Sequence, residues 1–377
     1  MKFTCDRTAL TEAVSIVQRA VATRSTITAL EGIMLKVSEG KVTLTGNDLE
    51  IGIECIIGAE DTRDGKVVVN STLFGNAVRK MAGAIVTMEM NDNNVVKIKH
   101  GQSMELKMEL GGIDGNEFPE IQRFDTEFDI NLSQREFKDL VRHTIFAVGT
   151  SEAKLILTGC LLEASGSNVN MVAVDGFRLA LKKIETEADA VNGYLGDVGI
   201  VIPSKTLKEL TGIIDDNDDK LIIKCSSKNI RFEFDNVIFT SRLLEGDYID
   251  YKKIIPSSFG LSVTADIKPL IDAVDRASII INSEMNKAPV IVRINDGMMN
   301  IYCETSAGKV DEVFPVESTG EEIEIGFNNK YLLEALKAST GEKLNMQFIG
   351  PVNPCLITPF EGDSFKFIVL PVRLKSE

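Results

Sequence analysis

The chain has 377 residues, a formal net charge of −15 at pH 7, six Cys, two His and no Trp. This length can bury a core in each of three domains. The absence of a C-x-x-C pair argues against zinc-ribbon and thioredoxin-like sites, and two His leave little for histidine-based catalysis or a histidine-rich metal centre.

The chain also lacks the G-x-x-x-x-G-K-[ST], G-x-S-x-G and H-E-x-x-H motifs of phosphate binding and hydrolysis. No apolar run approaches the roughly 18 residues of a membrane span, and the N-terminus reaches a charged residue before an apolar segment can build. We therefore expect a cytoplasmic, non-catalytic protein without cofactor or bound metal. We expect the six Cys to be buried small apolar residues.

One pattern of strand, polar cap, short amphipathic helix and further strands occurs six times. Three of the helices carry an apolar pair one helical turn apart. These pairs are Leu10 and Val14, Phe137 and Val141, and Leu270 and Val274. The other three helices are expected to begin near residues 70–72, 203–205 and 328–330, where Ser or Asn side chains can cap the first free backbone amides. Their buried positions are Phe74, Leu207 and Leu332.

Strands fill most of the chain between the helices. Three equivalent strands are expected at residues 41–45, 168–174 and 298–302, each after a turn rich in Gly, Asp or Ser. The pattern predicts an α+β fold of three tandem domains, each made of two βαβββ-like halves with two helices packed on antiparallel sheets. Short Pro-containing links place the domains at 1–120, 121–256 and 257–377.

The charges are unevenly distributed along this pattern. The six helical segments contain thirteen Lys or Arg against nine Asp or Glu, although the whole chain is strongly acidic. If the helices share one face, that face is basic and the remainder repels polyanions. The alternative is that Lys and Arg are simply favourable on helix surfaces, and composition alone leaves it open.

Three separated segments resemble signatures of a known family. They are Val172–Ala180 (VAVDGFRLA), Phe239–Leu243 (FTSRL) and Leu370–Leu374 (LPVRL), and their order and spacing resemble those of the bacterial β sliding clamp, the processivity subunit of DNA polymerase III. The resemblance extends over the whole chain. It implies a head-to-tail homodimer whose six repeats close into a ring, with the helices around duplex DNA and the sheets outside.

On this resemblance the protein confers processivity on a DNA-directed DNA polymerase, a nucleotidyltransferase holoenzyme, without being catalytic itself. Its partners would be double-stranded DNA of any sequence, the polymerase III α subunit, a clamp loader, and other polymerases and repair proteins. Arg24 matches a DNA-contacting arginine of the family, and basic helix residues are the other candidates. The candidate DNA-binding residues are Arg24, Arg79, Lys80, Lys138, Arg142, Lys205, Lys208, Arg276 and Lys337.

The resemblance also implies a pocket for short hydrophobic peptide motifs between the second and third domains. Aliphatic walls would receive Leu and Phe side chains, and Arg178 and Arg373 would bond to the peptide. The matching positions are Leu157, Val174, Gly176, Phe177, Arg178, Leu179, Ile249, Lys253, Ile254, Ile368, Leu370, Pro371, Val372 and Arg373. Outside the resemblance, core packing is the simpler interpretation of each aliphatic position.

Several positions differ from the family pattern. Phe177 stands where His is common, Ile249 where Pro is common, and Lys252-Lys253 where Arg residues are common. The chain also continues past Leu374 as Lys375-Ser376-Glu377. We expect an altered peptide preference in a pocket that is retained.

For the dimer interface, the alternating segment 104–108 predicts an edge strand late in the first domain. Residues 278–281 of the third domain are the expected opposite surface. The candidate residues are Leu106, Met108, Ile279 and Ile280. Two other classes remain open: an enzyme on the same scaffold, and a ring that assembles proteins without DNA.

Overall fold

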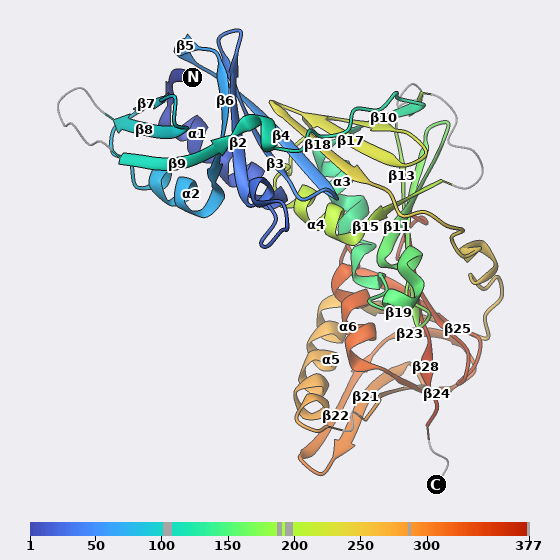
Figure 1. Cartoon of the computed structure of the whole chain (residues 1–377). Coiled ribbons are helices and arrows are strands. Elements are labelled where there is room, and N and C mark those ends of the chain that lie inside the picture. The colour runs from blue at the N-terminus through green and yellow to red at the C-terminus, as the bar shows by residue number, and fades with distance from the viewer. Residues whose placement is uncertain (101–107, 187–190, 193–198, 286–287, 375–377) are drawn as a thin grey trace. The chain divides into compact units, whose positions relative to one another are not determined.

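The structure is a computed structural model that describes residues 1–100, 108–186, 191–192, 199–285 and 288–374 (Figure 1). Its contacts divide the chain into two compact units. The first is Met1–Gln134 with Lys208–Leu243, and the second is Arg135–Leu207 with Leu244–Glu377. The middle of the chain thus contributes one half to each unit. The domain boundaries expected from the sequence remain a prediction, because the contacts group the chain in a different way.

All six predicted helices are confirmed. They are α1 (Arg7–Val17), α2 (Ser71–Arg79), α3 (Gln134–Arg142), α4 (Ser204–Thr211), α5 (Ile267–Asn282) and α6 (Asn329–Ala338). The side chains of Asp6, Asn70 and Asn328 accept hydrogen bonds from the first-turn amides of α1, α2 and α6. In Figure 1, α1 lies beside α2 and α5 lies beside α6.

Short 3₁₀ helices connect several of these elements. They are η1 (Gln18–Ala20), η2 (Thr28–Glu31), η3 (Gly115–Glu117), η4 (Ile145–Ala147), η5 (Glu152–Thr158) and η6 (Tyr251–Lys253).

The first unit contains one continuous antiparallel sheet. In spatial order its strands are β10 (Phe128–Ser133), β16 (Lys220–Cys225), β17 (Asn229–Phe234), β18 (Val237–Arg242), β4 (Ile51–Gly58), β3 (Lys41–Asn47), β2 (Gly32–Ser38), β6 (Gly65–Asn70), β9 (Met108–Asp114), β8 (Val95–His100), β7 (Ile85–Met90), β1 (Lys2–Asp6) and β5 (Glu60–Arg63). Leu10 and Val14 of α1 and Phe74 of α2 are buried, as their spacing predicts.

The second unit contains two sheets. The larger has the order β15 (Ile200–Pro203), β11 (Gly159–Ser165), β12 (Asn168–Val174), β13 (Arg178–Glu185), β27 (Phe365–Val369), β26 (Cys355–Pro359), β25 (Lys343–Phe348), β19 (Leu261–Asp266) and β23 (Glu317–Gly320). The smaller has the order β22 (Gly308–Pro315), β21 (Met298–Thr305), β20 (Val290–Asn295), β24 (Ile323–Phe327) and β28 (Pro371–Val372). A further short strand is β14 (Val191–Asn192).

Two strand pairs join segments that are distant in the sequence. Strand β4 pairs with β18, with Ile53 opposite Phe239, and β13 pairs with β27, with Ala180 opposite Phe367. Each pair continues a sheet across a boundary between two repeats. The backbone groups at these boundaries therefore form sheet hydrogen bonds. A buried backbone group without such a partner would destabilise the fold.

All six Cys are buried and none forms a disulfide. Burial raises the pKa of the Cys5 thiol to about 12 and that of Cys55 to about 11. These side chains therefore pack as neutral apolar groups, as expected.

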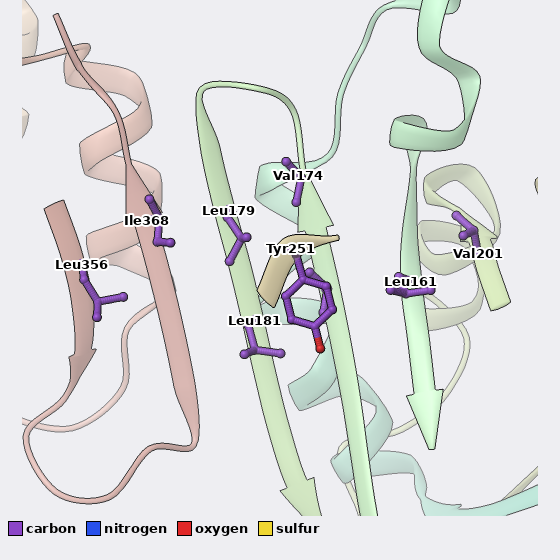
Figure 2. Close-up of a cluster of buried hydrophobic side chains, with 9 residues drawn as sticks. Leu161, Val174, Leu179, Leu181, Val201, Tyr251, Leu356 and Ile368 are labelled. Carbon is purple, nitrogen blue, oxygen red and sulfur yellow. The ribbon is translucent and has the colours of Figure 1, made fainter. Parts of the chain in front are cut away.

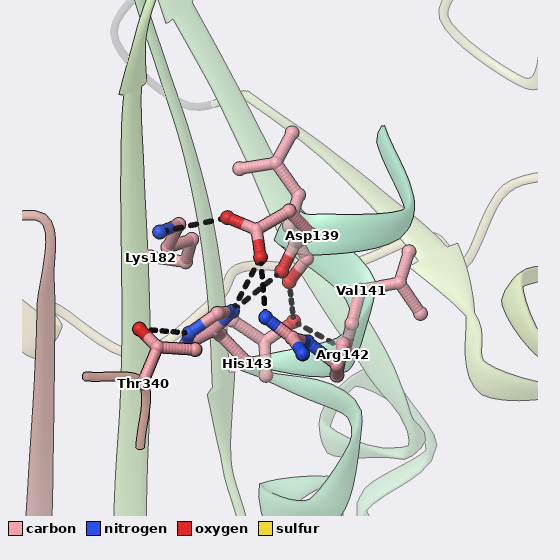
Figure 3. Close-up of polar contacts among 8 residues, drawn as sticks. Asp139, Val141, Arg142, His143, Lys182 and Thr340 are labelled. Atoms are coloured by element: carbon pink, nitrogen blue, oxygen red, sulfur yellow. Dashed lines mark hydrogen bonds and ion pairs between the residues drawn. The ribbon is translucent and has the colours of Figure 1, made fainter. Parts of the chain in front are cut away.

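A buried polar cluster connects four elements of the second unit (Figure 3). His143, just after α3, has a fully buried side chain, and its Nδ1 lies 2.8 Å from the Asp139 carbonyl oxygen. The Asp139 carboxylate lies 2.8 Å from Lys182 Nζ on β13 and 2.9 Å from Arg142. The imidazole also packs against Phe365 and Phe367 of β27, at centroid distances of 5.6 and 6.2 Å, and its Nε2 lies 3.4 Å from Thr340 Oγ1.

Asp139 carries the negative charge of this cluster. Burial acts to raise the pKa of its carboxyl, but hydrogen bonds from His143 and Lys182 outweigh that effect and hold the pKa well below its ordinary value. Stability from this carboxylate is therefore present above the unfolded-state pKa near 4 and is lost as pH falls toward the lower folded-state pKa.

We predict that Asp139→Asn lowers the free energy of unfolding by about 3 kcal/mol at pH 7, because it leaves the buried Lys182 ammonium without a counter-charge. Below about pH 4 the difference from the parent should shrink, since the Asp139 carboxyl becomes protonated in the unfolded parent while the folded parent keeps it ionised. Urea unfolding at pH 7 and at pH 3.5 measures both effects. Asp275→Asn is the control, because Asp275 and Lys337 form an exposed pair expected to contribute at most about 1 kcal/mol. Equal losses in the two variants would contradict the prediction.

Candidate peptide groove and basic helix surface

The conformation of the turn between β12 and β13 is set by a side-chain cap, a glycine with positive φ and a hydrogen bond to a distant segment. Asp175 Oδ1 accepts hydrogen bonds from the amides of Phe177 at 2.8 Å and Arg178 at 3.0 Å. Gly176 has a φ of +94°, a conformation that side chains disfavour. The amide of Leu370 donates to the Phe177 carbonyl at 2.9 Å, which attaches the segment after β27 to the turn.

A cavity of about 220 Å³ lies beside this turn. Its walls come from the segment around η5, from the turn itself and from the start of α6. The lining residues are Val148, Gly149, Thr150, Ser151, Lys154, Leu157, Asp175, Phe177, Arg178, Lys330 and Tyr331. The cavity is thus large enough for a peptide side chain and has both apolar and charged walls.

Arg178 organises one wall of this cavity. Its buried guanidinium donates to Asp175 Oδ2 at 2.9 Å and to the Glu334 carboxylate, and it lies over the rings of Tyr331 at 4.5 Å and Phe146 at 5.5 Å. The Phe177 ring stacks on Tyr331 with centroids 6.0 Å apart. Much of the hydrogen-bonding capacity of Arg178 is therefore used within the chain, so it holds the wall in place.

The aliphatic positions expected in the pocket divide into two groups. Val174, Leu179 and Ile368 are buried in a core cluster with Leu181 and Tyr251 (Figure 2), and their place in a peptide pocket stays a prediction. Leu157, Ile254 and Pro371 are half-buried. Four apolar residues are exposed to solvent, with Phe177 the most exposed at 59% of its surface. These are Phe177, Ile249, Leu370 and Val372.

The polar candidates lie on the surface. Lys253 is exposed and pairs with Asp250 at 2.8 Å, and Arg373 is exposed. Tyr251 of η6 donates to Glu163 at 2.5 Å, and burial together with that carboxylate raises its pKa, which keeps the phenol neutral.

The cavity residues that the sequence did not predict include Tyr331, Lys330 and Lys154. Tyr331 belongs to α6, for which the sequence predicted a DNA-binding residue, Lys337, and no pocket residue. The structure brings the start of α6 to the groove because Phe327 of β24 pairs with Pro371 of β28. That pairing joins segments more than 40 residues apart, and no local pattern reports it.

The nine basic candidates differ in how far their charge is already neutralised. Arg276 pairs with Glu312, Lys337 with Asp275 and Arg142 with Asp139. Arg79 donates to Gln18. Lys138 is half-buried and Lys205 is exposed. Within the described ranges, Arg24, Lys80 and Lys208 are exposed and form no ion pair.

The candidate interface residues are only partly described. Leu106 lies outside the described residues, and Met108 is the half-buried first residue of β9. Ile279 is 70% exposed and Ile280 is half-buried, and both belong to α5. The neighbouring edge strand of the smaller sheet is β22, whose alternation the sequence analysis did not identify. Of the residues described, none lies in a helix long and apolar enough to cross a membrane.

Tandem two-helix repeats joined through continuous antiparallel sheets define a clamp-type protein. Sequence models of the DNA polymerase III beta subunit match the chain in order, with the N-terminal domain at residues 1–122, the central domain at 131–250 and the C-terminal domain at 252–373. The chain therefore belongs to the DNA polymerase III beta subunit family, the β sliding clamps.

Individual relatives agree over the full length. The beta sliding clamp of Bacillus subtilis is 32% identical over 383 residues, covering 99% of this chain and all of the relative. A crystal structure of the Bacillus subtilis DNA polymerase sliding clamp has a TM-score of 0.92 at 32% identity and covers all of both chains. The structure of the DNA polymerase beta subunit of Streptococcus pyogenes has a TM-score of 0.92 at 28% identity, covering 99% of this chain and all of the other.

Proposed function

We propose that this chain forms a head-to-tail homodimeric ring around duplex DNA and holds the replicative DNA polymerase on its template. The match of three successive family domains along the whole chain carries this proposal. The chain would act in the cytoplasm as the non-catalytic processivity subunit of a DNA-directed DNA polymerase, a nucleotidyltransferase holoenzyme.

The charge pattern suits a ring that moves along DNA. Arg24, Lys80 and Lys208 can contact phosphates, while Arg276, Lys337 and Arg142 already have acidic partners. A lining of this kind contacts the phosphates weakly and without sequence preference. Retention on DNA then follows from enclosure, so it should resist salt that releases an ordinary phosphate-binding protein.

We predict retention on nicked circular DNA at high salt after loading with a clamp loader and ATP, and release once a restriction enzyme linearises the circle. Gel filtration before and after cutting measures the bound fraction. A well-characterised clamp loaded in parallel confirms that the loader is active. Release before cutting would contradict the proposal and would favour a ring that assembles proteins without DNA.

The groove beside the β12–β13 turn would bind the polymerase α subunit, the clamp loader and other partners through short hydrophobic peptides. Burying two large apolar side chains stabilises a complex by roughly 3 to 6 kcal/mol, whereas a micromolar Kd corresponds to about −8 kcal/mol. Polar contacts must supply the remainder. Lys154 and Lys330 at the cavity and Arg373 nearby are suitable donors, since none forms an ion pair within the described residues.

We predict that Tyr331→Ala weakens binding of a short peptide carrying Leu and Phe side chains by about tenfold, because the variant removes the ring that supports Phe177 and Arg178. Isothermal titration measures the Kd. Tyr302→Ala is the matched control, since Tyr302 lies on β21 away from the cavity lining. An unchanged Kd for Tyr331→Ala would remove this residue from the site.

We predict that Ile279→Lys yields monomers. Ile279 is exposed on α5, so the charge should leave the fold intact but could not be buried in an interface without a large desolvation cost. Sedimentation velocity measures the oligomeric state, and Val352→Lys, at another exposed apolar position, is the control expected to remain dimeric. A dimeric Ile279→Lys variant would exclude this surface as the interface.

A further inference from the structure

The turn that shapes the peptide groove occurs a second time, in the first unit between β3 and β4. There Asp48 Oδ1 accepts hydrogen bonds from the amides of Glu50 at 2.9 Å and Ile51 at 2.7 Å, as Asp175 does in the groove. Leu49 has a φ of +75°, at the position where Gly176 has +94°. Leu pays a steric cost in this conformation, so the rest of the turn must hold it there.

The strands beside the two turns are also equivalent. The amide of Arg242 donates to the Glu50 carbonyl at 3.1 Å, as the amide of Leu370 donates to that of Phe177 at 2.9 Å. Gly52 of β4 lies opposite Thr240 of β18, in the place of Leu179 of β13 opposite Ile368 of β27. The junction of β4 with β18 therefore repeats the backbone framework of the peptide groove.

The side chains that line the two grooves differ in size. In the first unit the apolar pair Leu179 and Ile368 is replaced by Gly52 and Thr240, which leaves space over the strand. The side chain of Ile121 fills that space. A Cβ atom on Gly52 would lie 2.6 Å from Ile121 Cδ1 and 2.7 Å from its Cγ1, so the isoleucine packs directly on the glycine backbone.

The segment that carries Ile121 is held in the groove by a further contact. Asn47 Nδ2 donates to the Pro119 carbonyl at 3.1 Å, and Asn47 is the residue paired with Gly52 across β3 and β4. The cavity that remains, lined by Ile121, Gly52, Thr240 and Arg242 among others, has a volume of about 70 Å³, against about 220 Å³ in the peptide groove.

We propose that the β4–β18 junction is a second peptide-accepting groove that the chain occupies with its own Ile121. The inference rests on the proposed peptide-binding function of the β13–β27 groove. Ile121 acts there as the aliphatic anchor that a partner peptide supplies at the other groove. Because the anchor is part of the same chain, its effective concentration exceeds that of any free peptide, and the groove stays closed.

Removal of the anchor should open the groove. In Ile121→Ala the space over Gly52 is empty, and an aliphatic side chain of a free peptide can enter it. Isothermal titration with the Leu- and Phe-containing peptide should give one site per protomer in the parent and two in Ile121→Ala, the second at least tenfold weaker. Ile121→Leu, which restores a side chain of similar volume, should bind one peptide.

The stoichiometry separates the two proposals. A parent that binds no peptide contradicts the function proposed for the β13–β27 groove. A parent and an Ile121→Ala variant that both bind one peptide overturn the self-occupied groove. If Ile121→Ala fails to fold, the same titration is made on Ile121→Ser, whose short side chain also lacks the Cγ and Cδ atoms that cover Gly52, and a second site that remains absent has the same meaning.

The position of the second peptide provides an independent check. A spin label on the peptide should broaden the methyl resonance of Ile51 in Ile121→Ala and leave it unchanged in the parent. Broadening only near the β12–β13 turn in both proteins would overturn the proposal, because any extra binding would then lie elsewhere.

Discussion

Backbone pairing between segments distant in sequence is the constraint on which the rest of this structure depends. The β4–β18 and β13–β27 pairs continue a sheet from one repeat into the next. Each pair satisfies the backbone groups at a repeat boundary and fixes the turn beside it through one further hydrogen bond, from Arg242 or from Leu370. The grooves are thus a product of how the repeats are joined, and side chains decide only whether a groove is open.

Local patterns in the sequence predicted the repeats well. The apolar pair Leu10 and Val14 and its counterparts mark helices that the structure confirms, because burial of one helix face depends on residues three or four apart. The Asn and Asp residues before the helices act as caps for the same local reason. Equivalent strands such as β3, β12 and β21 follow turns with positive φ at Gly40, Gly166 and Gly297, as expected.

The site was harder to predict because its parts are brought together over long distances in sequence. Tyr331 lies at the groove because β24 pairs with β28, and no local sequence pattern indicates this pairing. The role of Arg178 in bonding to a peptide stays a prediction, and its contacts with Asp175, Glu334 and Tyr331 are seen only in the structure. The predicted pocket residues include both exposed residues and buried ones such as Leu179, because the sequence pattern of an aliphatic residue on a strand does not indicate how exposed it is.

The burial of every cysteine has a consequence for the chemical behaviour of the protein. A thiol reacts with oxidants and alkylating agents as its thiolate, and burial disfavours that form at Cys5, Cys55, Cys225 and Cys355. The native fold should therefore resist oxidation without a reducing buffer. Because the native thiols are buried, a single cysteine introduced on the surface would be the only position that a maleimide dye labels.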